Sequence, residues 1–106
     1  MRGYLDFALQ EVQQGISRGY RVDNSYCLLR AEYHHSQWEL VIIAVEGDII
    51  TTTQAIVDFA KNNGFTSLRT HTKRRGKARY LRQHISPNIK DVFNPQDNEF
   101  ILSLRF

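Results

Sequence analysis

Hydrophobic positions along this chain alternate between helical and strand spacing. At the start, apolar residues lie three and four positions apart, which predicts a helix over residues 5–16. The polar stretch 18–24 is predicted to be a loop. Two segments rich in aromatic and branched side chains follow, 26–33 and 38–45, and we predict an antiparallel hairpin that turns at residues 34–37.

The strand predicted over residues 38–45 is the most hydrophobic segment of the chain. Beyond Glu39, both the even-numbered and the odd-numbered positions carry apolar side chains, so both faces of the strand are hydrophobic. We therefore expect this strand to lie centrally in a sheet and to be covered on both sides.

A strand–helix–strand unit is predicted to start with this central strand. Its helix is expected to begin at one of three consecutive residues whose hydroxyl groups can cap free amides: Thr51, Thr52 or Thr53. Gly64 is expected to end the helix in the left-handed conformation, and a strand over residues 65–72 follows. Because a helix joins them, the two strands should be parallel, with a right-handed crossover.

A second helix over residues 76–84 and an alternating strand over 99–106 complete the predicted elements. No repeat or linker interrupts the pattern, so we expect one domain of residues 1–106. Its class is α/β (α+β): a mixed sheet with an N-terminal helix, a hairpin, a central βαβ unit, a second helix and a C-terminal strand.

The charge of the chain is unevenly distributed. Residues 1–58 hold four basic and eight acidic side chains, whereas residues 59–90 hold nine Lys or Arg and no acid. Residues 91–106 hold one basic and three acidic side chains. A basic block between acidic ends indicates an anionic partner, or a self-complementary surface in an oligomer.

The single cysteine and the apolar runs limit where the protein is expected to act. Cys27 has no partner for an internal disulfide and is expected to be a buried side chain in a strand. The longest nearly apolar run, residues 40–45, is far shorter than the roughly 20 residues of a membrane span. Residues 1–4 lack the apolar core of a signal peptide, so we expect synthesis in a reducing cytoplasm.

A histidine pair, His34 and His35, lies in the predicted turn. Adjacent residues at a strand end are expected to point to opposite faces, and no Cys or Asp lies at the spacing of metal ligands. We expect exposed turn histidines and no metal site.

The pattern resembles the GNAT acyltransferases in the strand Glu39–Glu46, the helix through Phe59-Ala60, the sequence Asn63-Gly64-Phe65 and the following Arg75–Leu81. The resemblance covers residues 38–106 and implies a GNAT-like fold. In that family a glycine-rich loop before the helix holds the pyrophosphate of coenzyme A through backbone amides. Here residues 47–54 read Gly-Asp-Ile-Ile-Thr-Thr-Thr-Gln, with one early glycine.

The cofactor loop of the family is therefore replaced in this chain. Asp48 adds negative charge where a phosphate would lie, and the β-branched residues after it resist a tight loop. We therefore expect no bound cofactor. In the alternative interpretation, the hydroxyl groups of Thr51, Thr52 and Thr53 bind an anion at the start of the helix. More closely, the chain resembles short GNAT-like proteins encoded among the structural genes of tailed bacteriophages, which implies association with a virion.

A catalytic alternative follows from the family resemblance. Glu46 ends the central strand, where GNAT enzymes can place a general base, and Tyr80 matches the tyrosine of the later helix. The simpler interpretation makes Glu46 a strand-end residue paired with an arginine, and makes Tyr80 a packing residue. We expect no catalytic residues, because the cofactor loop is replaced.

The basic segment between the last predicted strand of the βαβ unit and the second helix is the most distinctive local feature. Its candidate contact residues for an anionic partner are Lys73, Arg74, Arg75, Lys77, Arg79 and Arg82. The leading hypothesis is a non-enzymatic structural or interaction protein that binds virion proteins, DNA, or both. The alternatives are an acyltransferase with an altered loop and a small nucleic-acid-binding regulator.

Overall fold

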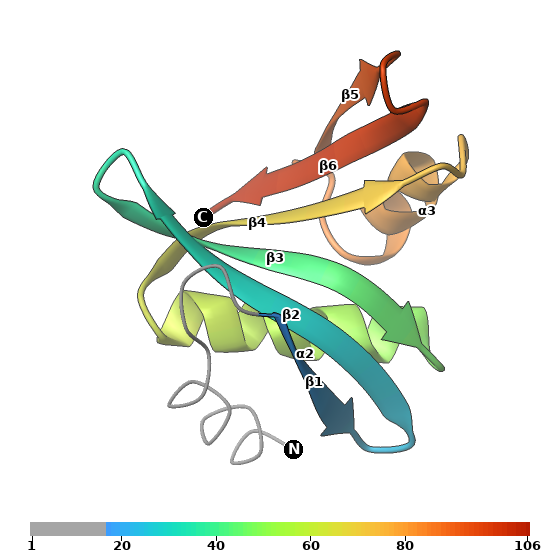
Figure 1. The fold of residues 1–106 in the computed structure, drawn as a ribbon. Coiled ribbons are helices and arrows are strands. Elements are labelled where there is room, and N and C mark those ends of the chain that lie inside the picture. Colours follow the sequence, from blue (N-terminus) through green and yellow to red (C-terminus); the bar gives the residue numbers. More distant parts are fainter. Residues whose placement is uncertain (1–16) are drawn as a thin grey trace.

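The computed structural model describes residues 17–106, so the helix predicted over residues 5–16 lies outside the described residues. The described chain forms one sheet of six strands in the order β1-β2-β3-β4-β6-β5, with two helices (Figure 1). In chain order the elements are β1 (Ser17–Val22), β2 (Ser25–His34), β3 (Gln37–Glu46), α2 (Ile49–Asn62), β4 (Phe65–Thr72), α3 (Lys77–His84), β5 (Lys90–Asn94) and β6 (Glu99–Arg105).

The predicted hairpin and βαβ unit are confirmed. β2 pairs antiparallel with β3, and the turn between them has positive φ at both central residues, 54° at His35 and 61° at Ser36. β3 and β4 are parallel and adjacent, joined through α2. Gly64 ends α2 with φ of +83°, the left-handed conformation that was predicted for it.

The prediction that residues 18–24 form a loop is wrong. Ser17–Val22 form β1, an edge strand that pairs antiparallel with β2. Tyr20 and Val22 are buried in the core. Because they are the only two large apolar residues of the segment, its alternation was too short to predict a strand. β5 was also absent from the predicted elements, because none of its five side chains is buried and, among residues 17–106, it pairs with β6 alone.

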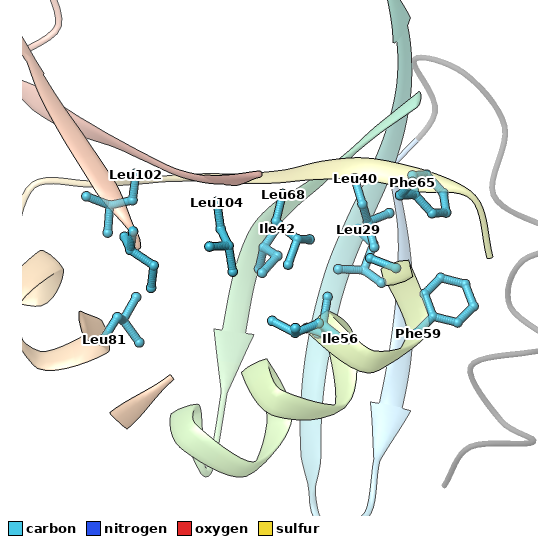
Figure 2. Packing of buried hydrophobic residues seen from close by; sticks show 14 of the residues in the cluster. Leu29, Leu40, Ile42, Ile56, Phe59, Phe65, Leu68, Leu81, Leu102 and Leu104 are labelled. Atoms are coloured by element: carbon cyan, nitrogen blue, oxygen red, sulfur yellow. The ribbon is translucent and has the colours of Figure 1, made fainter. Parts of the chain in front are cut away.

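Both described helices pack against the same face of the sheet. Figure 2 shows Ile56 and Phe59 of α2, and Leu81 of α3, on the side to which Leu40 and Leu104 point. Leu29, Leu40 and Ile56 have no measurable exposed surface, so this layer is the centre of the core. β3 is central in the sheet, as predicted, and a cover on its second face stays a prediction.

Candidate functional site

β3 and β4 separate toward their C-terminal ends. Their parallel pairing runs from Trp38 and Phe65 to Ile42 and Thr70, and Figure 1 shows the two strands diverging beyond it. A small cleft of about 50 Å³ lies in the opening, lined by Ile43, Ala44, Val45, Ile49, Thr70, His71 and Lys77, among others. Both helices start at this end of the sheet, so most of the functional residues predicted from the sequence fall around it.

The N-terminus of α2 is closed by a carboxylate from its own chain. Asp48 is the N-cap, and its Oδ1 accepts a hydrogen bond of 3.0 Å from the backbone N–H of Thr51. The N–H of Asp48 donates to Ser25 Oγ at 2.9 Å. The preceding Gly47 has φ of +107°, and a Cβ there would collide with Ser25, so this loop has one tight conformation.

The prediction that a threonine caps α2 is wrong, because the helix begins about one turn earlier than expected. Thr51 is exposed on the first turn, whereas Thr52 and Thr53 are buried, with 1% and 8% exposed surface. Their side chains lie against the core because the amphipathic stripe of the longer helix passes through them. Asp48 therefore takes the position from which an N-cap reaches the free amides.

The environment of Asp48 favours its negative charge. Hydrogen bonds from the backbone and side chain of Thr51, and from the backbone of Ile50, lower the pKa of this carboxyl below its usual value. The positive end of the α2 dipole is thus matched by a charge within the chain. A pyrophosphate would need the same amides that Asp48 occupies, so these residues do not fit coenzyme A in the position that the family uses.

The N-terminus of α3 has the opposite character. Its N-cap is Gly76, which supplies no side-chain hydrogen bond to the helix amides. An open depression of about 430 Å³ lies in front of it, lined by Ile49, Arg74, Gly76, Lys77 and Tyr80. Thr72 Oγ1 accepts a hydrogen bond of 3.1 Å from the N–H of Arg74, which holds the start of the basic loop against the end of β4.

The six predicted contact residues do not share one environment. Lys73, Arg74, Arg75 and Arg79 are exposed. Lys77 is half-buried, and its burial together with the neighbouring charge of Arg74 lowers its pKa. A bound anion would relieve this crowding of like charges.

Arg82 points elsewhere and has partners within the chain. Its Nη1 donates to the backbone carbonyl of Ile89 at 3.1 Å and to Asp91 Oδ1 at 2.9 Å. These bonds tie α3 to the start of β5, so Arg82 has a structural role in addition to any contact with a partner.

The two residues of the catalytic alternative lie on separate elements at the open end. Glu46 is exposed at the end of β3. Tyr80 is 46% exposed on α3, where its ring packs against His84 with centroids 4.7 Å apart. Tyr80 lines the depression at the start of α3, whereas Glu46 is not among its lining residues.

One acid–base pair near the cleft was missed by the sequence reasoning. His71 Nδ1 lies 2.8 Å from Glu99 Oε1, and His71 also lines the cleft between β3 and β4. The two residues are 28 positions apart and meet because β4 pairs with β6. No local motif marks such a pair, and only the strand register could have revealed it.

The face of the sheet opposite the helices carries a network of charges. Arg69 bridges Glu32 at 2.9 Å and Glu39 at 3.1 Å. Although burial raises the pKa of Glu32, Arg69 and Arg30 together hold it below its usual value. His34 lies 3.2 Å from Glu39, so three side chains with metal-ligating atoms come together here. Arg69 and Arg30 together balance the charges of the two carboxylates, which favours an ion-pair network over a metal site.

The turn histidines are exposed, as predicted, but their relative orientation was not predicted correctly. The rings of His34 and His35 meet edge to face with centroids 5.6 Å apart. His35 is already the first residue of the turn, with φ of 54°, so the alternation of a strand no longer applies to it.

Comparisons with known proteins support the fold and nothing finer. Neither the protein-family models nor the curated proteins include a match to this chain. The chain is similar in structure to a chain of the NatC complex, whose crystal structure was determined with Gag peptide and CoA bound. The TM-score is 0.59 and the sequence identity 11%, over 99% of this chain and 77% of that one.

This neighbour is an N-acetyltransferase with a GNAT-like fold. At such low identity the similarity establishes the fold alone, so the chain has a GNAT-like fold, as its sequence predicted. Among residues 17–106, no helix is both long enough and apolar enough to cross a membrane.

Proposed function

We propose that this chain is a non-catalytic interaction domain with a GNAT-like fold, which binds an acidic protein surface through the basic segment Lys73–Arg82. The observation that carries the proposal is the contrast between the two helix ends beside the open cleft. Asp48 occupies the amides of α2, whereas α3 begins at Gly76 without a side-chain cap and among exposed cations.

The surface around the start of α3 suits a protein partner. The depression combines the cations Arg74 and Lys77 with the apolar side chains of Ile49 and Tyr80. A carboxylate of the partner can pair with the guanidinium group while a neighbouring apolar side chain fills the hollow. Tyr80 is the only aromatic residue of the segment, which gives little stacking area for nucleic-acid bases.

The test uses two fluorescent probes: an acidic peptide of Glu and Leu residues, and a DNA duplex of about 20 base pairs, each titrated over a salt series. We expect the peptide to bind. A double substitution of Arg74→Gln and Arg75→Gln should lower its affinity at least about tenfold. The control variant carries Lys61→Gln and Lys90→Gln, which removes the same charge elsewhere.

The control variant decides how the result is interpreted. If the control substitutions lower the affinity for the peptide as much as the arginine substitutions do, binding depends on net charge alone and the proposed site is wrong. If the duplex binds more tightly than the peptide at every salt concentration, the chain is a nucleic-acid-binding protein instead, with affinity that falls steeply with salt.

The proposed setting is a bacteriophage virion assembled in the host cytoplasm, where the partner is another virion protein. This part of the proposal is supported by the sequence resemblance to short phage-encoded GNAT-like proteins. Mass spectrometry of purified particles tests it. A protein that is found in the lysate and never in the particle would contradict the virion setting while leaving the binding site untouched.

An acyltransferase is the second candidate, and the His71–Glu99 pair is the observation that favours it. The Glu99 carboxylate lies 2.8 Å from Nδ1 of His71 and orients the imidazole, and His71 lines the cleft, so its other nitrogen could act on a bound substrate. Calorimetric titration with acetyl-CoA separates the two candidates. We expect no binding heat; micromolar affinity that is lost in a Thr51→Glu variant would overturn the non-catalytic proposal.

A further inference from the structure

We infer that two copies of this domain associate edge to edge through β5, in an antiparallel pairing centred on Val92. The inference goes beyond the proposed function and does not depend on the basic segment. It rests on the exposure of this strand, on the residues that limit its length, and on the side chains that a second copy would bring together.

β5 is the outermost strand on one side of the sheet. Among residues 17–106 it pairs with β6 alone, so the backbone groups on its outer side have no strand partner there. Figure 1 shows β5 along the upper border of the sheet, away from α2. An edge of this kind is a template for one more strand.

The outer strand exposes apolar side chains that a soluble edge normally lacks. Val92 is 64% exposed, more than any other large hydrophobic residue in the described part of the chain. Phe93 is 47% exposed, with its ring 5.0 Å from that of Phe100. Natural edge strands usually carry charges at such positions, and here only the flanking Lys90 and Asp91 do so.

Neighbouring residues limit any added pairing to the five residues Lys90–Asn94. Pro95 lacks an amide hydrogen, so the ladder cannot continue beyond Asn94. On the other side, the N–H of Ile89 donates to Ser86 and its carbonyl accepts from Arg82. When a five-residue strand pairs antiparallel with itself over its full length, its middle residue, Val92, lies opposite its own copy.

This register brings complementary groups together. Val92 meets Val92 on one face, and the two Phe93 rings are diagonal neighbours on the other. Lys90 lies opposite Asn94, whose side-chain amide is 3.0 Å from the Asp97 carboxylate, so the basic start of one strand meets the acidic end of the other. The two nearest alternative registers place Asp91 opposite Asp91, or bring Pro95 into the ladder.

Disulfide trapping tests the register. A Val92→Cys variant should form a covalent dimer at least about ten times faster than a Lys90→Cys variant, because only residue 92 lies opposite itself. The two positions share a strand and a face, so Lys90→Cys controls for random collision. Cys27 contributes little background, because it is buried and its pKa is raised to about 11 by that burial.

Charges of opposite sign, introduced at the same position, test the association without a covalent bond. In sedimentation experiments we expect the unmodified protein to dimerise and the Val92→Lys and Val92→Glu variants to be monomeric. An equimolar mixture of the two variants should dimerise again, because opposite charges then face each other. This rescue excludes misfolding as the cause of the loss. Tyr26→Lys, at an exposed position on β2, should leave dimerisation unchanged.

Three results would overturn the inference. The unmodified protein could stay monomeric up to about 1 mM, which would mean an affinity lower than that of even a small specific interface. Lys90→Cys could form the disulfide as fast as Val92→Cys. The mixture of the Val92→Lys and Val92→Glu variants could remain monomeric while each variant is folded by circular dichroism.

Discussion

The two helices of this domain start near the same open end of the sheet, and their N-termini differ in almost every respect. α2 begins at Asp48, whose carboxylate accepts from the N–H of Thr51 and offsets the helix dipole. α3 begins at Gly76, with Arg74 and Lys77 beside it, so side-chain charge adds to the positive end of the helix. A charge within the chain matches the first end, whereas the second has no side-chain cap.

The difference shows that two helices packed on one face of a sheet can present termini of opposite electrostatic character. The Asp48 carboxylate after Gly47 closes one helix terminus, and the loop after β4 leaves the other without a side-chain cap. Four substitutions probe this comparison, ordered from the largest expected effect to the smallest.

Removing the core anchor of α2 should have the largest effect. Ile56 is fully buried, so Ile56→Ala should lower the free energy of unfolding by about 2–5 kcal/mol. Chemical denaturation measures the change. Gln54→Ala, at an exposed position of the same helix, is the control and should change it by less than about 0.5 kcal/mol.

Within the basic segment, Arg82 should matter for stability and Arg79 should not. Arg82→Ala removes the bonds to Ile89 and Asp91 and should cost about 1–2 kcal/mol, because the pair is partly exposed. Arg79→Ala should be within about 0.5 kcal/mol of the unmodified protein. Equal losses in both denaturation curves would contradict the structural role given to Arg82.

Giving α3 the cap that α2 has should make the two ends alike. A Cβ at Gly76 meets no atom within 4 Å, so Gly76→Asp is sterically tolerated. The new carboxylate should stabilise the domain by about 0.5 kcal/mol. It should also lower the affinity for the acidic peptide, because it takes the place of the peptide's carboxylate. A Gly76→Ala variant controls for the change in backbone entropy. Unchanged peptide affinity in Gly76→Asp would show that the α3 terminus is not part of the site.

The smallest expected effect is the pH dependence of the α2 cap. The pKa of Asp48 is lowered on folding, so its contribution to stability is complete above its unfolded value, about 3.8, and is lost as the pH falls through the folded value. The unmodified protein should therefore be slightly more stable than Asp48→Asn at pH 7, and the difference should vanish under acidic conditions. Thermal unfolding of both proteins across pH 3–7 measures it; a difference that grows toward low pH would have the wrong sign.

Elements with strong local patterns were predictable from the sequence. The hydrophobic run of β3, the stripe of α2 and the turn at Gly64 depend on residues within a few positions of one another, so they can be read without the neighbours. β1 and β5 could not be predicted in this way. Both are edge strands with few buried side chains, and their conformation is decided by pairing with β2 and β6.

The candidate site divides in the same manner. The Gly47-Asp48 segment and the cluster of cations were visible in the sequence, because both are continuous segments. The role of Arg82 was not visible because its partners lie beyond the end of α3, and the meeting of His71 with Glu99 was not visible because the two residues are 28 positions apart. The cap of α2 was mispredicted by three to five residues, although Asp48 is itself a good capping residue.

By itself, the sequence determined the order of most elements, the GNAT-like fold class and the place of the basic block, since hydrophobic spacing and continuous charge act over short distances. Only the tertiary structure decided that Asp48 caps the amides of α2, that Arg82 binds Ile89 and Asp91, and that β5 presents Val92 on an outer edge. These features depend on strand register and helix placement, which the whole packed core sets together.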